Sequence, residues 1–333
     1  MTSSARRFVA IFSMLTVGCG GPPPAPPTPA SPFAEPGALP ETTLRNLPGV
    51  AGVEVLVSVA DQRHRIIHIR DYHHVPRDLF AIDMSHAAGR TMPGAEVDRL
   101  YAAFLNNVDS LQAQQELLLG ALVEQYGLRQ VMVEGLTDEG QRNYDGIVNG
   151  FKATSDRLDA LRAEAAALEF DREPHVAQID RLIRGLRVET LPYGAAGRFA
   201  GRQQLKVLPL DDAALLETAN PVRPDGTVKA DPKVVAARND AQVRRALAGN
   251  PVTVIVLGGN HDLSAAVRRL GGGTTEYIRV TPLGYDESVA GGGEDGNGAG
   301  SGGSRTDRPH GRGCGVPSDG PRGADVPGPA ATK

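Results

Sequence analysis

Along residues 49–285, segments whose pattern of hydrophobic and polar positions is typical of strands alternate with segments whose pattern is typical of helices. Short apolar or alternating runs, typical of strands, recur at Val53–Ala60, Arg65–Asp71, Gln130–Leu136, Leu205–Leu210, Val252–Leu257 and Glu276–Val280. Between them, apolar residues recur at helical spacing over Glu96–Tyr126, Thr154–Glu169, His175–Val188, Asp231–Ala248 and Leu263–Leu270. This alternation predicts an α/β domain over residues 49–285, with a largely parallel sheet flanked by helices. The long helices between about residues 95 and 190 predict a helical insertion or cap.

Individual polar residues and one glycine predict where these elements begin and end. The polar residues around Asp61 predict a hairpin or another tight connection between the first two strands. Gly127 is expected to end the first long helix, because glycine readily adopts the left-handed conformation of a C-cap. Thr137 and Asp262 are expected to cap the N-termini of the helices that follow them.

The N-terminus has the pattern of a secretory signal peptide over residues 1–19. Arg6 and Arg7 precede a short apolar run, Phe8–Gly18, which meets Cys19. The segment LTVGC resembles a bacterial lipobox, in which the cysteine becomes lipidated. We therefore expect an exported protein of the cell envelope, anchored to a bacterial membrane by a lipid on Cys19. The alternative is an ordinary cleaved signal that happens to contain a cysteine.

Composition separates the predicted domain from its flanks and excludes some classes of partner. Residues 20–48 are rich in proline and predict an extended linker, whereas the Gly-rich residues 286–333 predict a disordered tail. A net charge of −4 and the absence of Trp give no reason to expect a nucleic-acid partner. Since Cys19 and Cys314 are the only cysteines, a disulfide framework or a Cys-based zinc site is excluded.

Polar side chains follow four of the predicted strands, where the chain leaves the sheet. They are Asp71, Tyr72, His73 and His74 after the second strand, Glu134 after the third, Asp211 and Asp212 after the fourth, and His261 after the fifth. In open α/β sheets, ligands bind at the carboxyl ends of the strands. Imidazole and carboxylate groups are common ligands of hydrolytic divalent metals. The sequence therefore predicts a metal site there, which would activate water for hydrolysis.

Each of these residues also has a structural explanation. A histidine at a strand end is more often a hydrogen-bonded loop residue than a metal ligand. Asp211 and Asp212 would serve as an N-cap pair for the short helix that follows them. Glu134 would pair with an arginine, and Arg238, on the helix before the fifth strand, would steady either a carboxylate or an anionic substrate.

The order of these motifs resembles a known superfamily. Gly258–His261 reads GGNH, Glu134 follows a middle strand, and Arg238-Asn239 lies on a late helix with Asp240 one place further. This pattern is similar to the superfamily that joins Tiki and TraB-type proteins, ChaN-like haem-binding lipoproteins and erythromycin esterase-like enzymes. Arg70–His73 departs from the first motif of that superfamily, because it lacks the glycine and has Asp where Glu is usual.

The resemblance implies two different functions. The first is a metal-dependent hydrolase of peptide, amide or ester bonds, with His73, His261 and Asp71 as metal ligands and with Glu134 and Arg238 as catalytic residues. The second is a non-catalytic haem- or iron-binding lipoprotein, in which Tyr72, His73 and His74 are the candidate haem ligands. The expected partners are accordingly a small molecule, a peptide or haem.

A calcineurin-like phosphoesterase is a less favoured third interpretation. The segment Gly259–Asp262 reads GNHD, and Asp71-Tyr72-His73 is an Asp-x-His motif, as in those enzymes. That family also requires a Gly-Asp motif between the two, and this chain contains no Gly-Asp dipeptide. It also requires further histidines downstream, where only His310 in the predicted tail remains.

Overall fold

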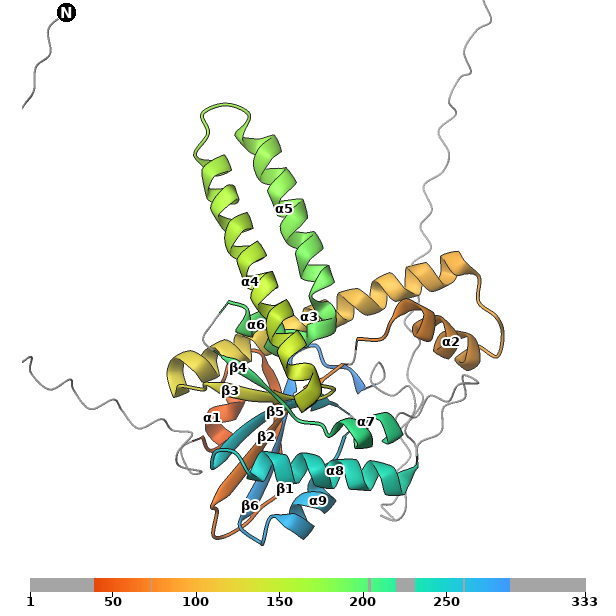
Figure 1. Cartoon of the computed structure of the whole chain (residues 1–333), viewed down its shortest axis with the longest axis vertical. Coiled ribbons are helices and arrows are strands. Elements are labelled where there is room, and N and C mark those ends of the chain that lie inside the picture. Colours follow the sequence, from red (N-terminus) through yellow and green to blue (C-terminus); the bar gives the residue numbers. More distant parts are fainter. Residues whose placement is uncertain (1–38, 73, 203–204, 220–230, 260, 288–333) are drawn as a thin grey trace, which may run out of the picture. The chain divides into compact units, whose positions relative to one another are not determined.

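The computed structural model describes residues 39–72, 74–202, 205–219, 231–259 and 261–287. All of them belong to one compact unit of the chain (Figure 1). The predicted signal peptide, Cys19 and most of the predicted linker and tail lie outside the described residues, as does His73.

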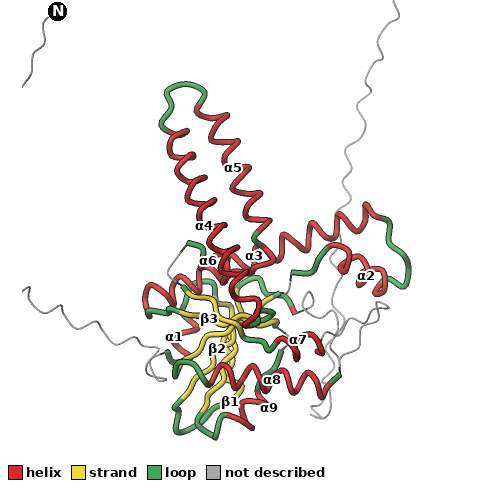
Figure 2. The backbone as a smooth tube through the Cα atoms, in the orientation of Figure 1, coloured by secondary structure: helices red, strands yellow, loops and turns green. Residues whose placement is uncertain are grey.

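The described residues form a six-stranded sheet in the order β1-β6-β2-β5-β3-β4. Figure 2 shows the strands of this sheet in yellow. Its strands are β1 (Val50–Val57), β2 (His64–Asp71), β3 (Gln130–Val133), β4 (Lys206–Pro209), β5 (Val252–Gly258) and β6 (Thr275–Pro282). Strands β2 to β6 are parallel, and β1 is antiparallel to β6. The α/β fold with a largely parallel sheet is therefore confirmed.

The hairpin expected around Asp61 is wrong, because β6 lies between β1 and β2. Val53 of β1 pairs with Val280 of β6, while Ile66 of β2 pairs in parallel with Tyr277 of the same strand. The reason is burial. The six interior positions of β2 are all buried, whereas β1 has exposed positions and forms the edge. A strand buried on both faces is typical of the centre of a parallel sheet, where neighbours cover both of its sides.

Helices cover both faces of this sheet (Figure 1). They are α1 (Glu41–Arg45), α2 (Arg77–Ala87), α3 (Gly94–Tyr126), α4 (Asp138–Ala166), α5 (Arg172–Glu189), α6 (Gly194–Ala200), α7 (Ala213–Ala219), α8 (Pro232–Leu247) and α9 (Ser264–Leu270). Leu122 of α3 and Ala196 of α6 share one core cluster with Ile67 and Val254 of the sheet. In a second core cluster, Val243 of α8 and Val267 of α9 pack with Ile255 and Leu257 of β5.

The expected helical insertion consists of α3, α4 and α5, of which α4 and α5 lie side by side as a hairpin (Figure 1). Gly127 ends α3 with a left-handed φ of 70°, as expected. The Thr137 hydroxyl accepts a hydrogen bond from the Gly140 amide and caps α4. None of the described helices is long and apolar enough to cross a membrane.

The domain extends beyond both boundaries expected from composition. Leu39, Leu44 and Leu47, placed in the linker, are buried in the core, and the Arg65 guanidinium donates to the Leu39 carbonyl. The last described residue, Glu287, pairs with Arg70, although composition predicts that it belongs to the tail. The high proline content of residues 20–48 predicts a linker, but the few leucines at the end of that segment are buried against the sheet. Composition therefore gave the wrong position for the first boundary.

Candidate functional site

The carboxyl ends of four parallel strands bring the predicted polar residues to one edge of the sheet. Asp71 of β2 lies beside Gly258 of β5, and the Gly259 amide donates to the Asp71 carbonyl. Glu134 follows β3, where its amide donates to the Val256 carbonyl of β5. The backbone contacts thus place residues far apart in sequence next to one another.

Arg238 of α8 joins two carboxylates at this edge. Its Nε and Nη2 donate to the two carboxylate oxygens of Asp211, each at 2.8 Å, and Nη2 also donates to Glu134 Oε1 at 2.7 Å. Burial alone would lower the pKa of Arg238, but the hydrogen bonds and charges of Asp211 and Glu134 outweigh it and raise that pKa. The two-point contact with Asp211 fixes the plane of the guanidinium.

Asp211 belongs to this cluster rather than to a helix cap. Its side chain is completely buried and also accepts hydrogen bonds from Gln242 Nε2 at 2.9 Å and the Gly135 amide at 2.7 Å. The neighbouring Asp212 alone caps α7, by accepting from the Leu215 amide at 3.0 Å. The prediction that Asp211 and Asp212 form an N-cap pair is therefore wrong for Asp211. The sequence feature that indicated a place for Asp211 in the site was its position directly after a buried strand.

Glu134 orients the imidazole of His261. Glu134 Oε1 lies 3.1 Å from His261 Nε2, and Glu134 Oε2 accepts from the Gly258 amide at 2.7 Å. The side chains of Glu134 and His261 are 8% and 12% exposed, so water screens this contact little. Because a carboxylate accepts hydrogen bonds, Nε2 is the donor in this contact, and Nδ1 is the other ring nitrogen of His261.

The predicted metal ligands are only partly described. Asp71 Oδ1 accepts from Gln115 Nε2 at 2.9 Å, at the same edge of the sheet. His73 lies outside the described residues. Among the residues that the structure does describe, no three His, Cys, Asp or Glu side chains are grouped to hold a metal ion. The imidazole of His261 nevertheless fits one feature of metal ligands, because such histidines usually donate their other ring nitrogen to a carboxylate.

The haem-ligand candidates have other partners. Tyr72 is buried, its hydroxyl donates to the Asp286 carbonyl at 2.8 Å, and its ring stacks on Tyr285 at 4.8 Å between centroids. His74 is half-buried, and burial lowers its pKa. Tyr72 would bind iron only after the segment around Tyr285 had moved.

Gly259 is where that C-terminal segment reaches the strand ends. A Cβ atom at Gly259 would collide with the Tyr285 ring and hydroxyl. Arg70 contacts both Gly259 and Tyr285. Its Nε donates to the Gly259 carbonyl at 3.1 Å, and its guanidinium lies 4.1 Å from the Tyr285 ring centre. The glycine is thus required for the close approach of the aromatic ring.

His68 is a buried histidine that sequence reasoning did not select. Its Nδ1 lies 2.7 Å from the Tyr277 hydroxyl, and its Nε2 lies 3.0 Å from the Leu257 carbonyl. Burial lowers the pKa of His68 to about 3, so the folded protein holds this ring neutral. His68 is therefore a core residue that contacts the Leu257 carbonyl of β5, rather than a proton donor at the carboxyl edge of the sheet. A histidine inside an otherwise apolar strand was the signal for such a satisfied core residue.

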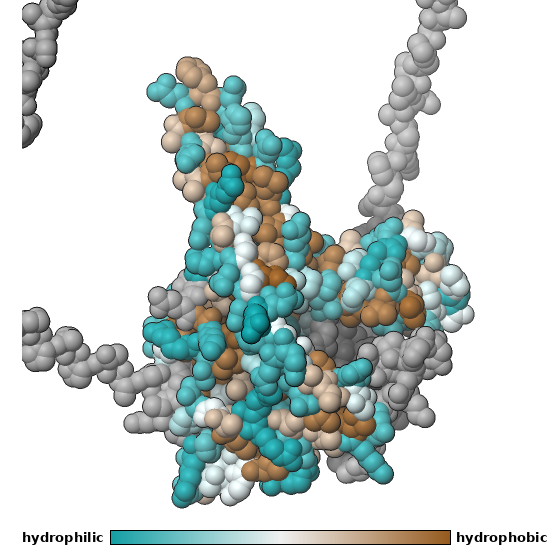
Figure 3. Space-filling model, viewed as in Figure 1, coloured by the Kyte–Doolittle hydropathy of each residue, from teal (hydrophilic) through white to brown (hydrophobic). Residues whose placement is uncertain are grey.

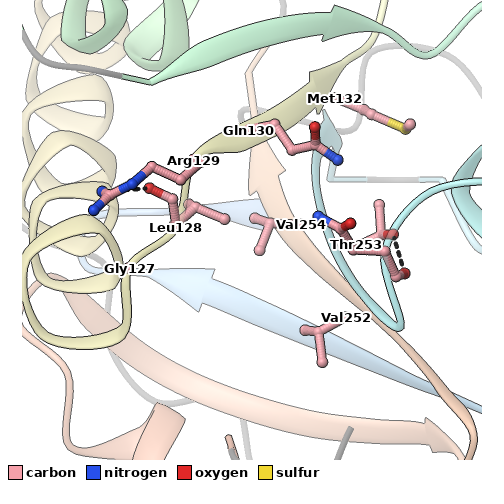
Figure 4. Close-up of a pocket in the computed structure, with 9 residues that line it drawn as sticks. Gly127, Leu128, Arg129, Gln130, Met132, Val252, Thr253 and Val254 are labelled. Carbon is pink, nitrogen blue, oxygen red and sulfur yellow. Dashed lines mark hydrogen bonds between the residues drawn. The ribbon is translucent and has the colours of Figure 1, made fainter. Parts of the chain in front are cut away.

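A cavity of about 190 Å³ lies away from this cluster, where β3 and β5 begin (Figure 4). It is lined by Gly127, Leu128, Arg129, Gln130, Met132, Asn250, Val252, Thr253 and Val254. None of these is an imidazole or a carboxylate, and the Thr253 hydroxyl donates to the Asn250 carbonyl. The cavity consequently contributes no group to the candidate site.

No family model, curated protein or solved structure matches this chain. The functions implied by the resemblance to the Tiki, TraB and ChaN-like superfamily therefore stay predictions.

Proposed function

We propose that the carboxyl edge of the sheet is the site of a metal-dependent hydrolase that cleaves peptide, amide or ester bonds. The contact between His261 Nε2 and Glu134 Oε1 is the observation that carries this proposal. Arg238 and the Gly258 amide hold the Glu134 carboxylate from two sides, so the imidazole ring is fixed before any ligand binds.

His261 is the residue that would bind the metal, through the Nδ1 lone pair. Glu134 would be its positioning partner, and Asp71 and His73 would supply further ligands. A bound divalent metal would acidify a water molecule and polarise the carbonyl oxygen of the substrate. Arg238 is occupied by two carboxylates, so we assign it to holding Glu134 rather than to contacting substrate.

The test combines hydrolysis with metal content. The full chain is assayed on ester, amide and peptide substrates with Zn²⁺, Mn²⁺ or Co²⁺, and bound metal is measured by elemental analysis after dialysis. His261→Ala is expected to lose the metal and to lower kcat/KM by about 100-fold or more. Glu134→Gln keeps a hydrogen-bonding oxygen and is expected to lower metal affinity by about 10–100-fold.

His86→Ala is the matched control, because His86 is an exposed histidine of α2 and should leave both readings unchanged. Hydrolysis that survives in His261→Ala would refute the assignment. A wild-type chain that takes up no divalent metal and cleaves none of the substrates would overturn the proposal. Haem binding, the other prediction from the resemblance, is measured separately by the Soret band after haem is added.

A further inference from the structure

The α4–α5 hairpin leaves hydrophobic residues in water. Besides each other, these helices mainly contact α6, β4 and the short turn Leu191–Tyr193. No residue of α5 is buried, and α4 buries only Val148 and Ala165. Figure 3 shows hydrophobic residues gathered along the hairpin among polar ones. Two helices alone cover one stripe of each other, so the flanks of that stripe stay open.

Leu161 and Leu182 lie on the same flank of the hairpin. The seam between the helices includes the half-buried Leu158 and Ile179, and each exposed leucine comes three residues after one of these. Because the helices run in opposite directions, equal offsets from the seam point to the same side. Leu161 is 39% exposed and Leu182 is 54% exposed. The ion pair between Arg162 and Asp180, at 2.7 Å, places the two leucines at about the same level.

Charges on this flank are arranged so that they complement a copy of themselves. Arg157 and Glu164 lie seven residues apart on α4, on either side of Leu161 along the helix. Both are exposed, and neither forms an ion pair within the described part of the chain. A two-fold axis at the level of Leu161 would place the Arg157 of each copy opposite the Glu164 of the other. In a two-fold dimer each such contact occurs twice.

We propose that this flank is a homodimer interface, in which the hairpins of two copies of the chain pack antiparallel as a four-helix bundle. Leu161 and Leu182 of both copies would form its apolar centre. The arginine and glutamate pairs would fix the register, since like charges in a shifted register repel each other.

Charge exchange tests both the interface and its two-fold axis. Full chains carrying different affinity tags are mixed in detergent, and association is measured by co-purification and by sedimentation. Arg157→Glu alone and Glu164→Arg alone each place like charges opposite each other and should weaken self-association by about tenfold. A mixture of the two single variants restores both pairs, so it should form the mixed dimer. The double variant should also restore self-association.

Arg184→Glu is the matched control, since Arg184 is an exposed arginine of α5 on a different side and should not change association. Leu161→Asp with Leu182→Asp should give a monomer with unchanged helix content by circular dichroism. A monomeric wild-type chain would overturn the proposal, and so would a mixture of the single variants that associates no better than either alone.

Discussion

Arg238 is a residue whose three contacts decide the arrangement of the candidate site. It donates to Asp211, 27 residues before it, and to Glu134, 104 residues before it. The carboxylates come from the ends of β4 and β3, so the guanidinium ties two strands to α8. A buried charge of this kind is tolerated only with its partners, because each ion has lost its water.

Removing the Arg238 charge should destabilise the fold. Arg238→Ala leaves Asp211 and Glu134 buried without their shared cation, which typically costs about 3–5 kcal/mol. Chemical denaturation measures the loss, and Arg244→Ala, which truncates an exposed arginine of the same helix, is the control. The control should shift the free energy of unfolding by less than about 0.5 kcal/mol. Equal effects of the two substitutions would contradict the buried network.

The element α1 shows how a short helix completes a core. It has only five residues, yet Leu44 within it and Leu39 before it are completely buried. Arg65 of β2 holds the Leu39 carbonyl and pairs with Glu276 of β6. The helix and the two strands thereby form one packed unit, although composition groups the helix with a linker.

Shortening the chain should reveal this contribution. A chain that starts at residue 39 keeps all three leucines and is expected to unfold cooperatively. A chain that starts at residue 49 loses Leu39, Leu44 and Leu47 and should be less stable by several kcal/mol, because one buried leucine is typically worth about 2–5 kcal/mol. Thermal unfolding compares the two. If their melting temperatures agree, α1 does not belong to the cooperative core.

At the scale of the whole molecule, one buried histidine links folding to pH. Folded His68 stays neutral down to about pH 3, whereas an unfolded histidine binds a proton below about pH 6.5. Between these values the unfolded chain holds more protons. The contribution of neutral His68 to the stability of the fold is therefore complete above about pH 6.5 and is lost as the pH falls toward 3.

We expect the free energy of unfolding to fall by on the order of 1 kcal/mol per pH unit across this window from His68 alone. Denaturation curves at several pH values measure the slope. His68→Gln should flatten it, even where the substitution also lowers stability at neutral pH. His86→Gln, at an exposed position, should leave it unchanged. A slope that is the same in the His68 variant would refute the linkage.

Most of the local structure and part of the candidate site were predictable from the sequence. The spacing of apolar residues records which face of an element is buried, and this is sufficient to predict the six strands, the long helices and the α/β class. The caps at Gly127 and Thr137 were predictable for the same reason, since their geometry depends on a few neighbouring residues. The apolar spacing did not predict the start of α4, because that helix begins at Asp138 and not at Thr154. Glu134 and His261 were selected because they follow strands that end at one edge.

Tertiary structure decided which elements are neighbours. The insertion of β6 between β1 and β2, the pairing of Arg238 with Asp211 and the burial of Leu39 all join residues far apart along the chain. Local periodicity states that a position is buried, but it does not identify the partner, because the order of strands in a sheet depends on the packing of the whole core. The sequence by itself determined the six strands, the longer helices and the polar strand ends, and only the packed sheet turned those ends into one hydrogen-bonded cluster.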